Sequence, residues 1–341
     1  MKLDHLYAIT DHTAVLQHAN FSVPDKREGY TTDDNARALV FGVKSQRFWP
    51  SERLIELQRK LLAFILLMQS KDGRFHNIMD FSQRIKDYPT TGDHLGRAIW
   101  SAGAVINSDL PTGMKNSARQ IFDRALPWGM ASSSPRTKAY TCLGLAERLK
   151  AEQSDRNLAG SLERLANDLI QEFEKNSSEG WEWFENTLTY DNARLSQALF
   201  IAYEAIENET LLSVAEKSLT FLLKATTKDE KHIPIGNNGW YTKGGKAATY
   251  DQQPVDAGAM METTAVAYDL TGKEIYANAF RQSLGWFYGH NTKAVAVYDP
   301  TTGACYDGIT STGLNENQGA ESTLSFLLGA ATAIERLVWD A

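Results

Sequence analysis

Three polar motifs in the sequence each carry an aspartate that could take part in acid–base chemistry. TTDDNARAL covers residues 31 to 39, TTGDHLGRAI covers 90 to 99 and LTYDNARLSQAL covers 188 to 199; in each, an arginine follows the aspartate three or four positions later. Breaking a glycosidic bond requires a carboxylic acid that protonates the leaving oxygen and a carboxylate that acts as nucleophile or as base for water. The candidate catalytic residues are therefore Asp33, Asp34, Asp93 and Asp191.

The first of these motifs also suits the start of a helix. Thr32 or Asp33 could be the N-cap, and Asp34 could be a first-turn acid with Arg37 as its i,i+3 partner. A cap does not require two consecutive acids, nor three related motifs that combine Asp with Arg. The residue pattern leaves open whether Asp33 pairs with Asp34 or Asp34 with Asp93, and which acid holds the proton.

Residues near these motifs could bind a sugar, since sugars present C–H faces to aromatic rings and hydroxyls to acids, amides and arginines. Aromatic residues surround the acids between residues 181 and 191. Segments 234–254 and 298–318 are each about 20 residues long, a length that is usually functional in a compact domain. The candidate ligand contacts are Arg37, Arg97, Trp183, Glu185, Arg194, Trp240, Tyr241, Asp251, Gln252, Gln253, Asn315, Glu316, Asn317, Gln318 and Glu321.

Two kinds of helix are expected to position these residues. Apolar residues recur every three or four positions in segments 54–68, 158–173 and 276–287, which indicates amphipathic helices. Between them lie helices rich in Ala, Gly and other small residues, each preceded by a polar motif. Six such motifs recur at intervals of roughly 40 to 65 residues, with these markers: Asp34, Asp93, Arg136, Asp191, Asp256 and Gln318.

This repeat predicts an all-α fold, an (α/α)6 toroid of six helical hairpins that uses residues 1–341 as one domain. Small-residue helices would crowd around the axis, and Leu-rich helices would cover them. Residues 4–19 would supply the twelfth helix and pair with the last inner helix near 318–335. All six polar motifs should then meet at one rim, where helix N-termini favour carboxylates.

Composition excludes several other classes of protein. The formal net charge of −7 and the absence of a basic face argue against nucleic acid. No apolar run approaches the roughly 20 residues of a membrane span, so we expect a cytoplasmic protein without a membrane partner. Two cysteines and seven dispersed histidines favour neither a disulfide framework nor a metal site. Without a glycine-rich phosphate loop, no cofactor is expected.

The motifs GYTTDDNARAL, LTYDNARLSQAL, DQQP and NENQGAEST, in this order, resemble a bacterial domain found fused to, or encoded beside, glycosyltransferases. That domain belongs to the six-hairpin glycosidase-like toroids. The resemblance implies an oligosaccharide or polysaccharide substrate and a possible glycosyltransferase partner. Within the wider group, residues 33–36 are similar to the D-D-N-A core of endo-α-1,6-mannanases, whose adjacent aspartates are nucleophile and acid/base. Arg37 stands where those mannanases tend to have an aromatic residue.

The resemblance therefore implies a glycoside hydrolase, with a mannose-containing glycan weakly favoured. The unsaturated glucuronyl hydrolases, another toroid group, use acids on different inner helices, an arrangement more like Asp34 with Asp93. Related toroids also include sugar epimerases and isomerases with histidine bases on inner helices, for which only His94 is suitably placed. A non-catalytic glycan-binding module is the third alternative.

Overall fold

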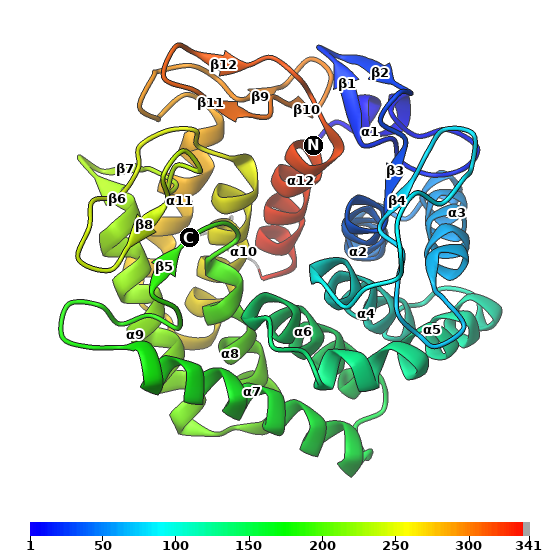
Figure 1. Cartoon of the computed structure of the whole chain (residues 1–341), viewed down its shortest axis with the longest axis horizontal. Helices are drawn as coiled ribbons and strands as arrows, with labels where there is room; N and C mark the ends of the chain where they lie inside the picture. Colours follow the sequence, from blue (N-terminus) through cyan, green and yellow to red (C-terminus); the bar gives the residue numbers. More distant parts are fainter. Residues whose placement is uncertain (337–341) are drawn as a thin grey trace.

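The computed structural model describes residues 1–336 and shows two concentric rings of helices (Figure 1). Each inner helix touches the next, and α12 touches α2, so that the inner ring closes. The predicted (α/α)6 toroid is therefore confirmed. The inner ring consists of α2 (Thr32–Phe48), α4 (Asp93–Ile106), α6 (Pro135–Ala151), α8 (Ala193–Ile206), α10 (Pro254–Thr271) and α12 (Ala320–Glu335).

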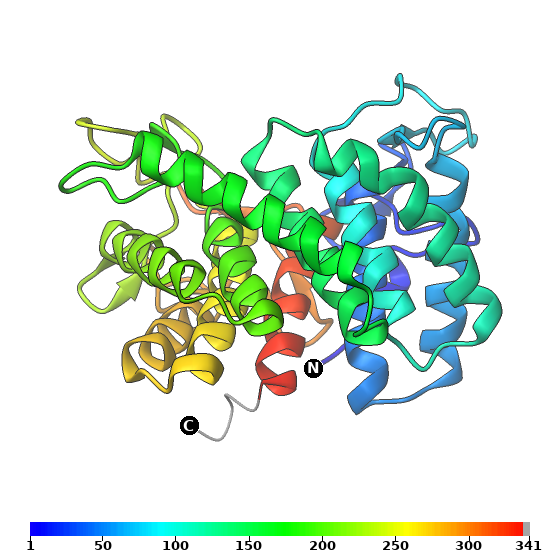
Figure 2. The same ribbon diagram turned by 90° about the horizontal axis from the view of Figure 1, so that it is seen from below.

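The outer ring covers the inner one (Figure 2); α1 packs on α12, and each of the other outer helices packs on the inner helix that precedes it in the sequence. The predicted amphipathic stripe is clear in the helix that contains Leu158, Leu165 and Phe173, all buried on one face. Inner helices are instead buried on almost every side, as their small residues require. The outer helices are α1 (Asp4–Ala8), α3 (Glu52–Met68), α5 (Thr112–Met130), α7 (Arg156–Asn176), α9 (Glu209–Thr226) and α11 (Glu274–Phe287).

The helix predicted over residues 4–19 covers only Asp4–Ala8, so its predicted length was wrong. The helix α1 does pack against α12, but it ends at Ala8. The Asp11 side chain accepts hydrogen bonds from the backbone N–H groups of Thr13 and Ala14, at 2.7 and 3.2 Å. Such a side-chain turn competes with helical hydrogen bonds, which explains why the chain leaves the helix and continues into a hairpin.

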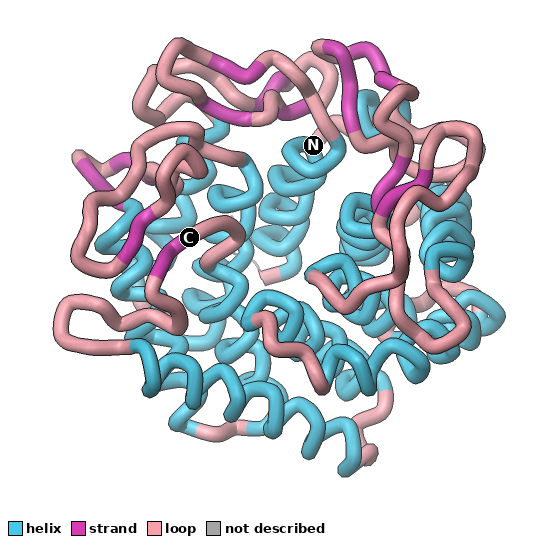
Figure 3. Tube along the Cα trace, viewed as in Figure 1, coloured by secondary structure: helices cyan, strands magenta, loops and turns pink. Residues whose placement is uncertain are grey.

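Short strands connect the loops around the ring (Figure 3). They form six two-stranded antiparallel ladders: β1 with β2, β3 with β4, β5 with β8, β6 with β7, β9 with β10 and β11 with β12. The β3–β4 ladder, which pairs Thr31 with Ile78, fixes the segment that leads into α2. The strands are β1 (His18–Asn20), β2 (Val23–Asp25), β3 (Tyr30–Thr31), β4 (Ile78–Met79), β5 (Thr187–Leu188), β6 (Thr227–Lys228), β7 (Lys231–His232), β8 (Tyr241–Thr242), β9 (Tyr298–Asp299), β10 (Ala304–Cys305), β11 (Gly308–Ile309) and β12 (Leu314–Asn315). In residues 1–336, no helix is both long and apolar enough to cross a bilayer.

Inner helices approach one another through glycines. A Cβ atom added to Gly103 of α4 would lie 2.3 Å from the carbonyl oxygen of Gly144 in α6, which is too close for any side chain. Gly160 on the exposed side of α7 has no atom within 4 Å of such a Cβ. Glycine is therefore required at Gly103, between two inner helices, but not at Gly160 on the outer ring.

Replacing these two glycines with alanine should have opposite effects on stability. Gly103→Ala should lower the free energy of unfolding by about 1–3 kcal/mol, because the helices must separate. Gly160→Ala should raise it by about 0.5–1 kcal/mol, because alanine restricts the unfolded chain and favours helix. Thermal or urea unfolding followed by circular dichroism would measure both. Equal effects would mean that the close approach of α4 and α6 does not limit the fold.

Candidate active site

The consecutive carboxyl groups of Asp33 and Asp34 lie in the first turn of α2. Thr31, not Thr32 or Asp33, is the N-cap, and its hydroxyl oxygen accepts a hydrogen bond from the backbone N–H of Asp34 at 3.1 Å. The side chain of Asn77, which comes from the loop before β4, accepts from the N–H of Asp33 at 3.2 Å. Both acids are thus held on a rigid helix start by groups outside the helix.

The Asp34 carboxyl group is buried and has only partial charge compensation. Arg37 donates to its Oδ1 at 3.0 Å, as the i,i+3 spacing predicted, and Thr31 donates to Oδ2 at 2.7 Å. The same Arg37 guanidinium also binds Glu321 of α12 at 2.7 Å. Burial raises the pKa of Asp34 to about 6; Arg37 opposes this rise, while the charges of Glu321 and Asp33 add to it.

The surroundings of Asp33 shift its pKa in the opposite direction, downward. Arg97 of α4 donates to its Oδ1 at 2.6 Å, and the Asn77 amide donates to Oδ2 at 3.1 Å. Although burial opposes ionisation, Arg97, Arg37 and His94 together hold the pKa of Asp33 below its usual range. The two neighbouring acids therefore have pKa shifts of opposite sign, which is typical of paired catalytic carboxyls.

A cavity of about 290 Å³ opens above this pair. Its wall comes from α2, the segment around β1, the loop before β4, and the long loop that leads into α12. The predicted contacts Arg37, Gln253, Asn315 and Glu321 line it together with both aspartates. The remaining lining residues are Gln17, His18, Thr31, Asn77, Asp307, Gly319 and Ser322.

Asp191 lies outside this cavity and contributes through Arg97. Its Oδ2 accepts from Arg97 at 3.1 Å and from the hydroxyl of Tyr140, and its Oδ1 accepts from Arg194 at 3.3 Å. Its side chain is fully buried, and its φ of 51° is left-handed, just before α8 begins. This places Asp191 beneath the cavity as the support of Arg97.

The ion pairs continue from Asp191 down the axis of the ring. Arg194 donates to Glu262 of α10 at 2.5 Å, and Thr332 of α12 donates to the second oxygen of Glu262 at 3.3 Å. Five carboxylates thus share three guanidinium groups, in the order Glu321, Arg37, Asp34, Asp33, Arg97, Asp191, Arg194 and Glu262.

Asp93 belongs to a separate cluster at the rim. Its carboxylate accepts from Ser134 and Thr137 of the neighbouring hairpin, at 3.2 and 3.0 Å, and from the Tyr190 hydroxyl at 2.7 Å. Glu185 likewise binds Arg136 at 2.8 Å. Neither acid lines the cavity above Asp34.

The rim beside Tyr190 holds further predicted contacts. Trp240 lies 6.4 Å from Tyr190, centroid to centroid, and both rings are partly exposed. Asp251 is half-buried at the end of the same long loop, and Glu316 is exposed near the cavity mouth. These three predicted contacts, Trp240, Asp251 and Glu316, reach the surface around the site without lining the cavity itself.

Several predicted contacts have structural positions instead, and sequence patterns did not distinguish them. Trp183 is fully buried among Phe184 and Phe221, because its apolar ring packs under the loop. Gln252 is also fully buried and is held by Thr292 and Trp286.

The other three predicted contacts outside the cavity take part in packing or in loop structure. Tyr241 packs its ring edge against Trp181, at 5.1 Å between centroids. Gln318 is buried and bonds His5 through its backbone carbonyl. Asn317 holds Asp307 and the backbone of Ala19, so it supports the cavity wall from behind.

Seven of the cavity residues were not among the predicted site residues, and His18, Asn77 and Asp307 are three of them. Asp307 accepts hydrogen bonds from the Gly319 N–H at 3.0 Å and the Ser322 hydroxyl at 2.6 Å, and so caps α12 from another segment. Burial raises its pKa. His18 lies in β1 and Asn77 lies in the loop before β4, and no sequence pattern marked either as a site residue.

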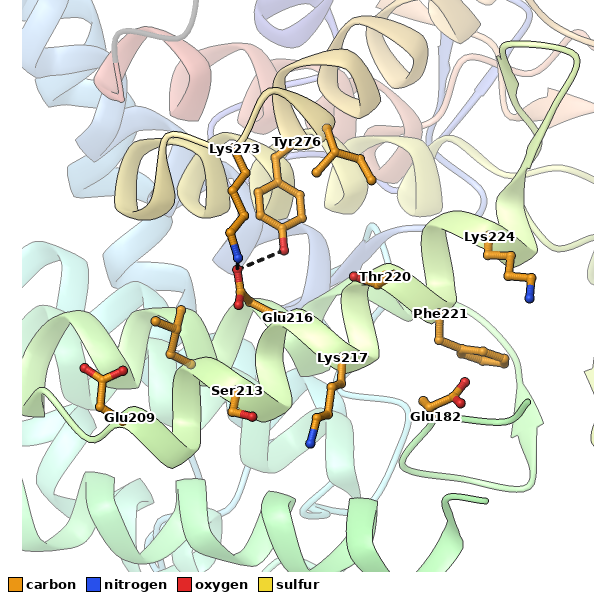
Figure 4. Close-up of a pocket in the computed structure, with 12 residues that line it drawn as sticks. Glu182, Glu209, Ser213, Glu216, Lys217, Thr220, Phe221, Lys224, Lys273 and Tyr276 are labelled. Carbon is orange, nitrogen blue, oxygen red and sulfur yellow. Dashed lines mark hydrogen bonds and ion pairs between the residues drawn. The ribbon is translucent and has the colours of Figure 1, made fainter. Parts of the chain in front are cut away.

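A larger groove of about 610 Å³ lies on the outer ring, between α9 and α11, and is not part of this site (Figure 4). Figure 4 shows Lys273 and Tyr276 of α11 pointing toward Glu216 of α9, which binds both. Its acids and lysines lie on solvent-facing helices, without two facing buried carboxyls. Its size alone does not make it a site.

Comparison with known proteins identifies the fold. No protein-family model matches the chain, and no curated protein matches its sequence. The structure is similar to cellobiose 2-epimerase from Bacillus thermoamylovorans B4167, with 9% identity, a TM-score of 0.77, and 100% of this chain and 96% of that chain covered. A sugar epimerase from a ruminal bacterium has 12% identity, a TM-score of 0.76, and coverage of 98% and 94%.

An α-1,6-mannanase from Salegentibacter sp. HEL1_6 is also similar, with 11% identity, a TM-score of 0.66, and 98% of this chain and 96% of that chain covered. One structure of that mannanase is an inactive variant with two consecutive aspartates replaced by asparagine, bound to α-1,6-mannotriose. At these identities the likeness shows the fold alone. The chain has the fold of six-hairpin glycosidase-like enzymes.

The opposite pKa shifts of the two acids predict opposite effects on stability. The pKa of Asp34 rises from about 3.9 in the unfolded chain to about 6 in the fold. Its ionisation therefore costs stability as the pH rises through this range. Asp34→Asn should gain stability over the unmodified protein between about pH 4 and pH 6, by on the order of 1–2 kcal/mol, and keep that gain at higher pH.

Asp33→Asn is the matched control in the neighbouring position. Since the pKa of Asp33 is depressed, its stabilisation is present above the unfolded pKa and is lost as the pH falls through the folded value. Asp33→Asn should therefore be destabilised at pH 7 and approach the unmodified protein under strongly acidic conditions. Thermal unfolding from strongly acidic pH to pH 8 would test both variants. A loss of stability in Asp34→Asn that did not vary with pH would contradict the assignment.

Proposed function

We propose that the protein is a carbohydrate-active enzyme that hydrolyses a glycosidic bond, with Asp33 and Asp34 as its two catalytic carboxyls. The observation that carries this proposal is that both acids line one cavity and have pKa shifts of opposite sign. Hydrolysis of a glycoside needs one protonated and one ionised carboxyl at the same bond. The fold shared with a mannanase and with sugar epimerases supports a sugar as ligand.

Each acid has the environment that its proposed role needs. Asp34, with its pKa near 6, donates a proton to the oxygen of the departing sugar and then recovers one from water. Asp33 stays ionised because Arg97 binds it, and its charge stabilises the cationic centre that forms on the sugar carbon. The Asn77 amide holds the second oxygen of Asp33 and so fixes the direction of the carboxylate.

The other predicted catalytic acids take supporting roles in this proposal. Asp191 orients Arg97 and is a positioning residue. Asp93 holds the Tyr190 ring beside Trp240, where a sugar face could stack next to the cavity. A mannose-containing glycan is the proposed substrate. It is supported by the D-D-N-A motif and by the mannanase whose inactive variant lacks two consecutive aspartates.

Hydrolysis should depend on both acids. With α-1,6-linked mannooligosaccharides as substrate, Asp34→Asn should lower the rate of reducing-end release by about 10²–10⁴-fold, because the leaving oxygen loses its acid. Asp33→Asn should lower this rate by at least as large a factor. Asp109→Asn, an exposed acid in a loop on the outer side of α4, should keep full activity. Full activity in both Asp33→Asn and Asp34→Asn would exclude the proposed roles.

A substrate panel separates the proposal from a binding role. The protein should be incubated with mannan, glucan and uronate-containing oligosaccharides, and binding should be measured in parallel by calorimetry. Binding of an oligosaccharide without release of reducing ends would favour a glycan-binding module, such as one that works with a glycosyltransferase. Copurification of a glycosyltransferase with the tagged protein would support the proposed partner.

Sugar epimerisation or isomerisation is the second candidate, and two observations favour it. The reported epimerases have higher TM-scores than the mannanase, and the imidazole of His18 lines the cavity. His94, the histidine that the sequence predicts as the base of this reaction, instead bonds the backbone carbonyl of Phe75 at 3.1 Å and lies outside the lining. Among the described residues that line this cavity, His18 is the one histidine.

Proton exchange at the sugar distinguishes the two reactions. Mannose and cellobiose incubated with the protein in D₂O should show no deuterium at C2 by NMR if the enzyme is a hydrolase. His18→Asn should then change hydrolysis only modestly. Deuterium uptake that is lost in His18→Asn and kept in Asp34→Asn would replace the hydrolase proposal with the epimerase.

A further inference from the structure

A small cavity lined by buried residues lies next to the Asp191 turn, beside Asn192. Its volume is about 10 Å³, and it lies between the start of α8, the start of α10 and the strand β7. Asp256 of α10 and His232 of β7 line it together with Asn192 and Thr226. The proposed hydrolysis uses none of these four residues directly.

Two polar atoms at this cavity have no protein partner. Within the described residues, Oδ2 of Asp256 and Nε2 of His232 are both buried and unbonded. The two residues are 7% and 2% exposed. A buried polar atom without a partner costs on the order of 1–3 kcal/mol, so two at one cavity indicate a bridging group. A space of this size is just large enough for one water molecule.

The chemistry of the lining matches a single water molecule. Burial raises the pKa of Asp256 well above its usual value, and the Asp191 carboxylate adds to this, whereas Arg136 and the N–H groups of Asn192 and Asp191 oppose it. Burial lowers the pKa of His232 to about 3, so its ring is neutral. The neutral acid can donate to water, and water can donate to His232 Nε2 and to the Thr226 hydroxyl oxygen. Three hydrogen bonds are typical of a buried water.

Asp256 also contacts the backbone that shapes the turn. The N–H groups of Asp191 and Asn192 face its carboxyl group. Asn192 is the N-cap of α8, yet its side chain makes no cap hydrogen bond to that helix. The left-handed conformation of Asp191 is disfavoured for a residue other than glycine unless its surroundings hold it.

We propose that Asp256 and His232 together bind one water molecule, and that this unit holds the Asp191 turn in the conformation that positions Arg97 under Asp33. Asp256 is thus a positioning residue. It acts on the larger cavity, which contains Asp33 and Asp34, through Asp191 and Arg97. Its carboxyl group serves as a neutral hydrogen-bonding group, whose proton binds the water and whose oxygens hold the Asp191 turn.

The first test counts protons and does not need catalytic activity. Because burial raises the pKa of Asp256, we expect the folded protein to keep this proton at pH 7, where the unfolded chain has Asp256 ionised, and unfolding should then release it. Calorimetric unfolding in two buffers of different ionisation enthalpy gives the number of protons released. Asp256→Asn should release about one proton fewer than the unmodified protein, and Asp109→Asn should show no change. An unchanged count for Asp256→Asn would overturn the proposal.

The second test measures the coupling through water. Asp256→Leu and His232→Leu each leave the other polar group without its bridge, so each should lower the melting temperature. The double variant leaves neither, so its loss should be smaller than the sum of the two single losses. Additive losses would show that no shared water connects the residues. If Asp256→Leu fails to fold, a high-resolution crystal structure of the unmodified protein must show a water between Asp256 and His232.

The third test addresses positioning and rests on the proposed hydrolysis. Asp256→Asn keeps an oxygen acceptor and an N–H donor, so its pH profile should match that of the unmodified enzyme. In Asp256→Leu the acidic limb of the profile should shift to higher pH, because Asp33 loses the support of Arg97. An unshifted limb would reject the positioning role. The proton count and the double variant remain informative even if no hydrolysis is found.

Discussion

The structure depends on a largely buried network of ion pairs in which acids outnumber bases; the Glu321 side chain at its end is 43% exposed. All six inner helices contribute to it: α2, α4, α8, α10 and α12 supply charged groups, and α6 supplies the Tyr140 hydroxyl. Removing these charges from water costs several kcal/mol for each ion unless partners compensate. Three guanidinium groups cannot fully compensate five carboxylates. Burial raises the pKa of Asp34 to about 6, and the opposing charge of Arg37 is shared with Glu321, so the two adjacent acids differ in pKa.

The shared guanidinium groups also link the acids to the rest of the ring. Arg97 serves Asp33 at the cavity and Asp191 beneath it, so a change at one acid alters the environment of the other. The helix starts that present these acids are held by side chains from other segments. Asn77 holds the start of α2, Asp307 caps α12 and Asp256 faces the start of α8. The closed ring provides this arrangement, because each hairpin brings its polar end beside the next.

Most of the fold and part of the candidate site could be predicted from the sequence. The alternation of amphipathic and small-residue helices, each headed by a polar motif, predicted the toroid and the ring order. The pairing of Arg37 with Asp34 followed from their i,i+3 spacing, which is a property of the helix alone. The length of the first helix could not be read in the same way, since the Asp11 turn that ends it depends on one side chain rather than on a period.

The sequence by itself determined which residues stand at helix starts, because helical periodicity and capping are local properties. Only the tertiary structure decided which of those residues meet. Arg97 binds Asp33 at the start of α2 and Asp191 just before α8, rather than Asp93 four positions away on its own helix. Trp183 and Gln252 point into the core, whereas His18 and Asp307, which no motif marks, line the cavity. The different pKa shifts of Asp33 and Asp34 likewise arise from burial and from distant charges, and neither is encoded in the spacing of neighbouring residues.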